Sequence, residues 1–162
     1  MSPVDQPIQL HHVSKQFGSF RVLDDVSLGV SQGEATVVLG RSGTGKSVLL
    51  KHIVGLLLPD QGRVFVQGQE LTALPAAKIA SVRRQIGFLF QNAALFDSLT
   101  VGDNVGFPLR RHTQLSEGSI RARAQDKLAL VGLERDYNKL PAALSGGMRK
   151  RAGLARAMAL DP

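Results

Sequence analysis

Two stretches near the N-terminus alternate apolar and polar residues. They are residues 8–17 (IQLHHVSKQF) and 21–30 (RVLDDVSLGV), and Gly18 and Ser19 lie between them. A period of two places the apolar side chains on one face of a strand. The pattern predicts an antiparallel strand pair with one covered face.

Two other stretches are continuously apolar. Residues 35–40 (ATVVLG) and 86–91 (IGFLFQ) have no polar face, which is typical of strands buried on both sides of a parallel sheet. A third, shorter strand is predicted at residues 63–68 (RVFVQG), where Gly68 ends it.

Helical spacing of apolar residues predicts three helices. Residues 46–57 (KSVLLKHIVGLL) and 78–84 (KIASVRR) form the first two, and the pattern is mainly helical after Gln91. Within that later part, residues 116–133 begin with a capping serine, Ser116, and end near Gly132 at a helix C-terminus. Strands followed by helices indicate an α/β fold.

The turn between the first apolar strand and the first helix carries a phosphate-binding motif. It reads Gly40, Arg41, Ser42, Gly43, Thr44, Gly45, Lys46, Ser47 and matches G-x-x-x-x-G-K-[ST] in full. Glycines let backbone N–H groups turn inward as an anion-binding nest. Lys46 can reach the β- and γ-phosphates of a nucleotide, and the Ser47 hydroxyl can ligate Mg²⁺. A chance match is disfavoured by the order strand, loop, helix.

A second glycine pair begins the last helical stretch. In Leu144-Ser145-Gly146-Gly147-Met148, the serine is a helix N-cap candidate and the glycines leave N–H groups exposed at a helix start. Alone this motif is also compatible with an ordinary capped helix. Its position about 100 residues after a phosphate loop makes a second anion site the better interpretation.

The charge is unevenly distributed along the 162 residues. Residues 110–162 hold 11 Lys and Arg against 5 Asp and Glu, whereas residues 1–109 hold 9 against 8. A nucleic-acid or anionic-lipid surface would explain this surplus. We prefer a solvated helical region, because no aromatic residues interleave with the basic ones and a base-stacking surface is therefore not visible. The absence of cysteine fits a reducing compartment.

With both glycine motifs in place, the chain resembles the nucleotide-binding subunits of ABC transporters. Residues 144–147 match the family's LSGGQ signature, with Met148 in place of glutamine. The resemblance implies that Phe17 stacks on adenine and that Gln91 is the glutamine that reaches the Mg²⁺ site and signals to the membrane subunit. A core position for Phe17 and a polar strand end for Gln91 are the alternatives.

The resemblance also implies the layout of the chain and its ligands. The ligands are ATP and Mg²⁺: Lys46 and Gln91 take part in catalysis, Ser47 and Gln91 hold the metal, and residues 40–47 and 145–148 with Phe17 contact nucleotide. Residues 1–91 would be a β subdomain with the phosphate-loop core, residues 92–143 a helical subdomain, and residues 144–162 the signature and its helix. The catalytic Asp-Glu pair and a histidine switch would follow Pro162, so the chain is expected to be C-terminally truncated, with an incomplete sheet and no activity of its own.

A narrower resemblance is carried by residues 90–113 (FQNAALFDSLTVGDNVGFPLRRHT) and 144–162. They are similar to the ATPases of the Mla type, lipid-trafficking ABC transporters with MCE-domain partners. This implies a head-to-tail dimer with a second copy, an integral membrane permease contacted by the Gln91 region and residues 107–109, an MCE-type substrate-binding subunit and no nucleic acid. It also implies a cytoplasmic location on the inner membrane. The alternatives are another ABC importer, a soluble ABC ATPase of DNA repair or translation, and a non-catalytic nucleotide-binding module.

Overall fold

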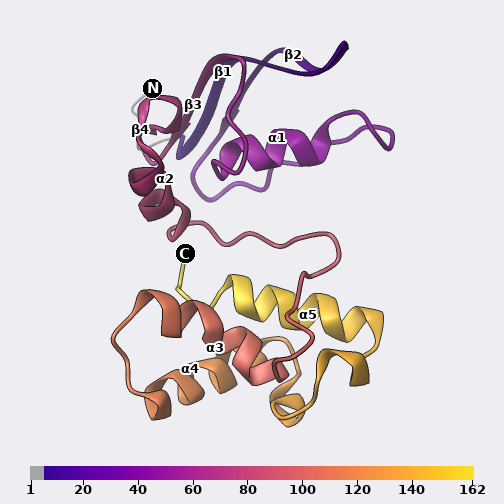
Figure 1. Ribbon diagram of the computed structural model, residues 1–162, viewed down its shortest axis with the longest axis vertical. Coiled ribbons are helices and arrows are strands. Elements are labelled where there is room, and N and C mark those ends of the chain that lie inside the picture. Colours follow the sequence, from indigo (N-terminus) through magenta and orange to yellow (C-terminus); the bar gives the residue numbers. More distant parts are fainter. Residues whose placement is uncertain (1–5) are drawn as a thin grey trace. The chain divides into compact units, whose positions relative to one another are not determined.

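The computed structural model describes residues 6–162 and divides the chain into two compact units (Figure 1). The first unit ends at Arg83 and the second begins at Arg84. The first holds an antiparallel sheet with two helices, and the second is helical. The predicted α/β class is confirmed.

The first unit is built on a four-stranded sheet in the order β2-β1-β3-β4. Strands β1 (Ile8–Phe17) and β2 (Phe20–Val30) form the predicted antiparallel pair, with Phe17 opposite Phe20 at the turn. Strand β3 (Gln61–Val66) pairs with the other edge of β1, and the short β4 (Gln69–Glu70) pairs with β3. All pairings are antiparallel.

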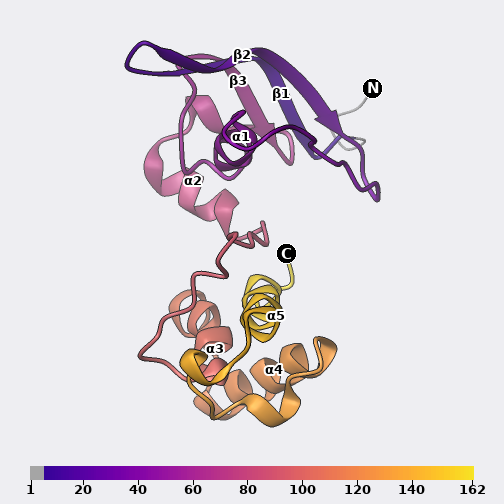
Figure 2. The same cartoon turned by 90° about the vertical axis from the view of Figure 1, so that its right-hand side faces the viewer.

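Helices α1 (Lys46–Ile53) and α2 (Ala76–Arg83) complete the first unit, with a 3₁₀ turn η1 (Leu71–Ala73) after β4. Figure 2 shows α1 lying along one face of the sheet. The apolar period expected for the helices decides which side chains face the core. The buried apolar residues of this unit are Leu10, Val13, Leu23, Leu49, Ile53, Val54, Val64, Val66, Leu71, Ile79 and Val82.

Helix α1 is shorter than the predicted span 46–57. It ends at Ile53 because Gly55 takes a left-handed φ of 64° just beyond the helix. A Cβ at Gly55 would also lie 2.6 Å from the Ile79 side chain. Glycine therefore both ends α1 and permits close approach of α2.

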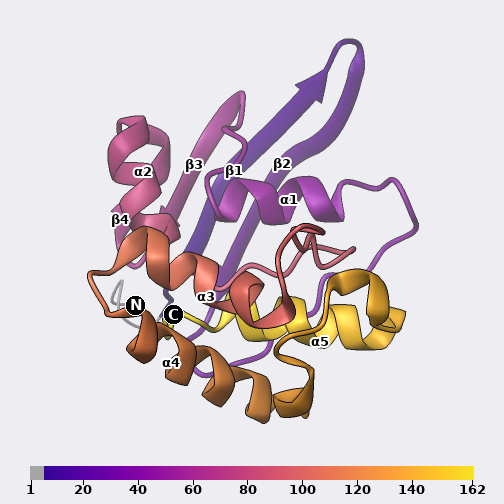
Figure 3. The same ribbon diagram turned by 60° about the horizontal axis from the view of Figure 1, so that its bottom comes forward.

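The two buried strands predicted at residues 35–40 and 86–91 are wrong. Both segments are irregular, and Figure 3 shows the first as an extended coil between β2 and α1. Val37 is 74% exposed and Leu39 is 86% exposed. Among the described residues no strand pairs with either segment, so their backbone groups have no ladder to join. A parallel strand needs neighbours in the sheet, which apolar sequence alone does not supply.

The second unit packs three helices around one core. They are α3 (Val101–His112), α4 (Glu117–Leu130) and α5 (Gly146–Ala157), each in contact with the other two. Two 3₁₀ turns, η2 (Glu134–Asp136) and η3 (Pro141–Ala143), connect α4 to α5. The core consists of Val101, Val105, Leu109, Ile120, Ala124, Leu128, Leu133, Tyr137, Leu144, Ala152, Ala155 and Ala159. The helical pattern after Gln91 is confirmed, and so are the Ser116 cap and the left-handed Gly132 after α4.

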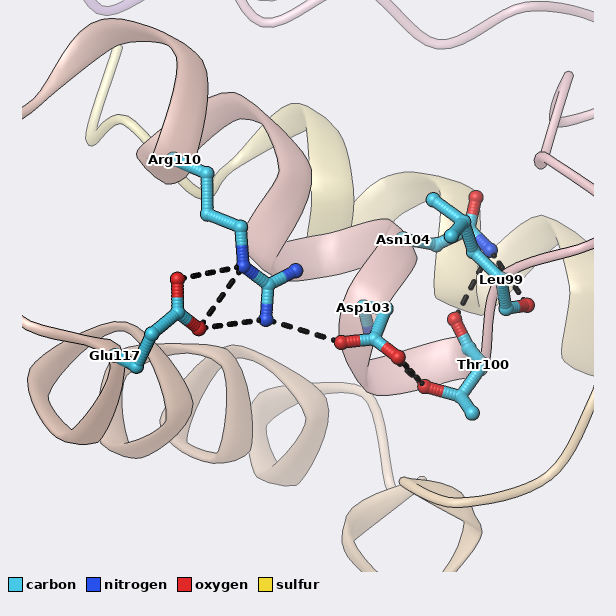
Figure 4. Close-up of polar contacts among 6 residues, drawn as sticks. All are labelled: Leu99, Thr100, Asp103, Asn104, Arg110 and Glu117. Carbon is cyan, nitrogen blue, oxygen red and sulfur yellow. Dashed lines mark hydrogen bonds and ion pairs between the residues drawn. The ribbon is translucent and has the colours of Figure 1, made fainter.

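The start of α3 is held by a polar network (Figure 4). The Thr100 hydroxyl accepts a hydrogen bond from the Asp103 backbone N–H at 3.1 Å and donates one to the Asp103 carboxylate at 2.6 Å. Arg110 lies two turns further along α3. It donates to Asp103 at 3.0 Å and to Glu117 at the first turn of α4. A carboxylate at a helix N-terminus is also favoured by the helix dipole.

This network makes acid stability dependent on Asp103. The Thr100 hydroxyl, and after it Arg110, lower the pKa of Asp103 below its usual 3.8. A depressed folded-state pKa contributes stability above the unfolded-state pKa, and this contribution is lost as pH falls through the folded-state value. We expect Asp103→Asn to be less stable than wild type near neutral pH, and the difference to shrink as the pH falls below 3.8, the usual pKa of an aspartate, and the carboxylate becomes protonated.

The measurement is urea unfolding followed by tyrosine fluorescence. Tyr137 is the only tyrosine in the chain, which has no tryptophan, and it lies in the core of the second unit. Asp126→Asn on exposed α4 is the matched control, since Asp126 forms no ion pair among the described residues. An equal difference for Asp103→Asn at both pH values would show that Asp103 acts only as a polar cap.

Within residues 6–162, no helix is long and apolar enough to cross a membrane.

Candidate nucleotide site

An irregular segment connects β2 to the phosphate loop, residues 40–47, and this loop leads directly into α1. Gly43 and Gly45 adopt left-handed φ values of 83° and 92°. Gly45 caps α1 without a side chain, and a Cβ there would lie 2.9 Å from the Val22 carbonyl oxygen. Both glycines are therefore required by the backbone path.

Several N–H groups of this loop have no partner. Among the described residues, the backbone N–H groups of Gly43, Gly45, Lys46 and Ser47 donate no hydrogen bond, whereas Thr44 N–H bonds the Arg41 carbonyl at 3.4 Å. Unpaired donors at the start of a helix form an anion-binding site, and the helix dipole adds to their attraction. A Cβ at Gly43 would meet nothing within 4 Å, so the space beside the loop is open.

Lys46 folds back over the loop. Its Nζ donates to the carbonyl oxygens of Gly40 at 2.7 Å and Arg41 at 2.6 Å. The side chain is half-buried, and no carboxylate forms an ion pair with it among the described residues. The ammonium thus has carbonyl partners but no anionic one, and a bound phosphate would supply the anion.

Ser47 fits the metal role that the motif assigns to it. It lies exposed in the first turn of α1, and its hydroxyl has no hydrogen-bond partner among the described residues. A free hydroxyl next to a phosphate site is a suitable Mg²⁺ ligand. The described residues contain no cluster of three His, Asp or Glu that could hold a metal ion without the phosphates.

Phe17 lies at the end of β1 in the same unit as the phosphate loop. Its side chain is 47% exposed, and the Lys15 ammonium lies 5.5 Å from its ring centroid. The core position considered for Phe17 is wrong, since nearly half of its side chain is exposed. Stacking on adenine stays a prediction.

The other predicted site residues belong to the second unit. Gln91 is exposed and begins a turn of residues 91–94, which we name the Gln91 turn. Ser145 caps α5, where its hydroxyl accepts a hydrogen bond from Met148 N–H at 3.2 Å. The structure therefore brings Phe17 and the phosphate loop into one unit, and Gln91 and residues 145–148 into the other.

The α5 start has the same open donors as the phosphate loop. Among the described residues, Gly146 N–H and Gly147 N–H donate no hydrogen bond. A Cβ at Gly147 would meet nothing within 4 Å, and a Cβ at Gly146 only the end of the Arg149 side chain at 3.9 Å. These glycines are not needed for packing inside the chain, so the free space is available to an external group.

Two residues with evident structural roles were not singled out from the sequence: Asn104 is fully buried, and Arg156 contacts the Gln91 turn. His52, which recurs at helical spacing within residues 46–57, is 1% exposed, and its Nε2 has no partner among the described residues. A polar residue at a core position of an apolar helix period could have identified Asn104. Arg156 is one of several basic residues on α5, and nothing in the sequence distinguishes it.

The ABC transporter family model matches residues 23–162, and the chain belongs to this family. It is 48% identical over 160 residues to the probable ribonucleotide transport ATP-binding protein mkl of Mycobacterium tuberculosis, which covers 99% of this chain and 45% of that protein. It is 43% identical over 155 residues to the intermembrane phospholipid transport system ATP-binding protein MlaF of Haemophilus influenzae, covering 96% of this chain and 59% of that protein. The chain thus spans about half the length of these curated relatives.

Solved structures agree with this family. A dimeric bacterial ABC transporter cassette superposes with a TM-score of 0.90 at 35% identity, over 96% of this chain and 70% of that chain. The post-hydrolysis state of a cassette bound to ADP and Pi gives a TM-score of 0.89 at 34% identity, with the same coverage. The predicted ABC ATPase fold is confirmed.

Proposed function

We propose that this chain is the ATP-binding part of an ABC transporter subunit that couples ATP binding and hydrolysis to phospholipid movement between membranes. The observation that carries the proposal is the phosphate loop, with its unpaired N–H groups and a Lys46 ammonium that has no carboxylate partner among the described residues. The lipid substrate is supported by the likeness to MlaF. Ribonucleotide transport is the second candidate, on the likeness to the mycobacterial protein.

The chain's own residues divide the work on the nucleotide. The N–H groups of residues 43–47 hold the phosphates, and Lys46 exchanges its two carbonyl partners for β- and γ-phosphate oxygens. Ser47 would hold Mg²⁺, with Gln91 as a second proposed ligand, and the ion would neutralise phosphate charge. Phe17 would stack on the base. Among the described residues no carboxylate makes a polar contact with the loop, so we expect the 162-residue chain alone to bind ATP without turning it over.

The proposed partners are a second copy, an integral permease and an MCE-type subunit, and the proposed location is the cytoplasmic face of the inner membrane. In the dimer, the free N–H groups of Gly146 and Gly147 in one copy would meet the γ-phosphate held by the other. Support for a dimer comes from the dimeric cassettes of similar fold. A soluble ABC ATPase of DNA repair or translation would bind nucleotide equally but would not depend on a permease.

The dimer can be tested with a matched pair of helix caps. We expect Ser145→Arg in the intact protein to keep ATP binding and to lose ATP-driven dimerisation, because the guanidinium fills the γ-phosphate position. Ser116→Arg is the control: Ser116 caps α4 in the same way, accepting from Ser119 N–H at 3.3 Å. Both changes remove a cap worth about 1 kcal/mol. Light scattering in the presence of ATP measures the dimer fraction of each variant. Equal dimerisation of the two variants would show that Ser145 acts only as a helix cap.

The membrane contact predicted for residues 107–109 needs a correction. Leu109 is fully buried in the core of the second unit, so it cannot contribute to a surface that contacts a permease. Phe107 is 41% exposed and its ring lies 4.7 Å from that of Phe96, which is also exposed. Phe107 thus remains available to a permease helix, and Leu109 does not.

Introducing a charge at position 107 or at position 109 distinguishes a surface residue that contacts a permease from a core residue. We expect Phe107→Glu to abolish lipid transport in reconstituted vesicles while ATP binding and the Tyr137 unfolding transition stay near wild type. Leu109→Glu buries a charge in the core and should unfold the second unit. Leu130→Glu on α4 is the control, because Leu130 is 71% exposed. Unimpaired transport by Phe107→Glu would exclude this surface from the permease contact.

A further inference from the structure

Arg156, near the end of α5, holds the Gln91 turn. Its Nη1 donates to the Ala94 carbonyl and its Nη2 to the Ala93 carbonyl, both at 2.8 Å. The guanidinium carbon also lies 5.8 Å from the Phe96 ring centroid. A planar guanidinium can make two parallel hydrogen bonds of this kind, which a lysine ammonium cannot reproduce.

The turn held by Arg156 is strained. Ala93 and Ala94 have φ values of 61° and 50°, in the left-handed region that residues with a Cβ rarely adopt. Inside the turn, Ala93 N–H bonds the Phe90 carbonyl at 2.9 Å and Ala94 N–H bonds the Asn92 carbonyl at 2.7 Å. Such a conformation persists only where surrounding contacts impose it. Arg156 supplies these contacts from outside the turn.

Glycines allow the two segments to approach closely. A Cβ at Gly153, one helical turn before Arg156, would lie 2.8 Å from Ala93 Cβ and 3.0 Å from Leu89 Cδ1. A Cβ at Gly87 would lie 2.9 Å from the Ala157 carbonyl oxygen. Residues 87–94 therefore run along α5 in direct contact with it. Ala93 is 1% exposed in this contact.

Because the Arg156 guanidinium is partly desolvated, it depends on its polar partners in the Gln91 turn. Desolvation lowers the pKa of Arg156 below its usual value, and no carboxylate pairs with it among the described residues. Its charge is therefore compensated by the two carbonyl dipoles and the Phe96 ring. Removing the guanidinium would leave two carbonyl groups without their partner.

We propose that Arg156 is a positioning residue that makes the Gln91 turn and helix α5 a single rigid body. Ser145 is the N-cap of this helix, so a displacement imposed on Ser145 is transmitted to Gln91 through Arg156 and the Gly153 contact. The link itself is a property of the second unit. Its use in the ATP cycle rests on the function proposed above for Gln91 and Ser145.

The link can be tested without nucleotide, by hydrogen exchange of the intact protein followed by mass spectrometry. In Arg156→Ala, the amides of residues 92–94 should exchange about tenfold faster, while α3 and α4 keep wild-type rates. Arg156→Lys should give an intermediate rate, because it restores the charge without the paired donors. Arg135→Ala, an exposed arginine without polar contacts among the described residues, is the control for loss of charge.

A second variant reaches the same turn by another route. Gly153→Ala inserts a methyl group against Ala93 and keeps Arg156, so it should also release residues 92–94. It serves as the test if Arg156→Ala does not fold. Leu128→Ala, in the core, shows the pattern of general destabilisation, with faster exchange across all three helices. Wild-type exchange of residues 92–94 in both Arg156→Ala and Gly153→Ala, or the Leu128→Ala pattern in both, would overturn the proposal.

A final arm separates the link from the proposed function. In the wild-type protein, ATP should slow exchange both at residues 92–94 and at residues 145–148, and in Arg156→Ala only the second response should remain. If wild-type protein binds no ATP, the proposed function fails while the nucleotide-free comparison still decides the link. If ATP protects both segments equally in Arg156→Ala, the transmission through Arg156 is wrong.

Discussion

Replacing Lys46 with alanine should weaken ATP binding by the intact protein about 100-fold. Two hydrogen bonds from a cation to phosphate oxygens are worth roughly 3 kcal/mol in total, and 1.4 kcal/mol corresponds to a factor of ten. In the structure, Lys46 reaches over the phosphate loop to Gly40 and Arg41 and forms no ion pair among the described residues. Isothermal titration calorimetry with Mg-ATP measures the loss.

The control for this prediction lies on the same helix. Lys51 is exposed in the last turn of α1, away from the loop, so Lys51→Ala should bind ATP as wild type does. The thermal transition of both variants should remain near that of wild type, since neither side chain belongs to the core. Wild-type affinity in Lys46→Ala would refute the assignment of residues 40–47 as the phosphate site.

Replacing Asn104 with alanine should destabilise the second unit by about 3 kcal/mol. Its side chain is fully buried, and its amide oxygen accepts from Phe96 N–H at 2.8 Å. Its amide nitrogen donates to the carbonyl oxygens of Phe96, Leu99 and Thr100 at 3.0, 3.2 and 3.0 Å. Figure 4 shows Asn104 pointing back toward Leu99 and Thr100. Buried polar groups that lose their partners cost the full desolvation energy.

Urea unfolding followed by Tyr137 fluorescence isolates the second unit. Asn104→Asp should be comparably destabilised, because a carboxylate would face three carbonyl oxygens without donating to them. Asn138→Ala is the control, since Asn138 is exposed. A midpoint for Asn104→Ala within error of Asn138→Ala would mean that water replaces the amide, and that residues 96–100 do not depend on this side chain.

Local sequence patterns predicted the elements whose partners are near in the chain. The β1–β2 pair is joined by Gly18 and Ser19, and the α4 and α5 starts are capped by Ser116 and Ser145. The strand pair depends on the alternation of apolar and polar residues, and the caps depend on side chains that bond a backbone group three residues away. The phosphate loop is of the same kind, because its glycines fix the backbone path within a few residues.

The contacts that connect distant parts of the chain were not predictable in this way. The apolar stretch 35–40 reads as a buried strand, yet it is exposed because strand formation requires backbone partners from elsewhere in a sheet. Asn104 and Arg156 act on backbone groups of residues 93–100, and any polar side chain of suitable length would give the same sequence signal.

The sequence by itself therefore determined the α/β class, the glycine-rich loop that leads into α1 and the capped helix at Ser145, since each is specified by spacing and by residue chemistry within a few positions. Only the tertiary structure decided that Leu109 is core while Phe107 is exposed, that residues 35–40 and 86–91 are not strands, and that Arg156 joins the Gln91 turn to α5. Burial and long-range hydrogen bonds depend on which distant segments meet, and a linear pattern does not contain that information.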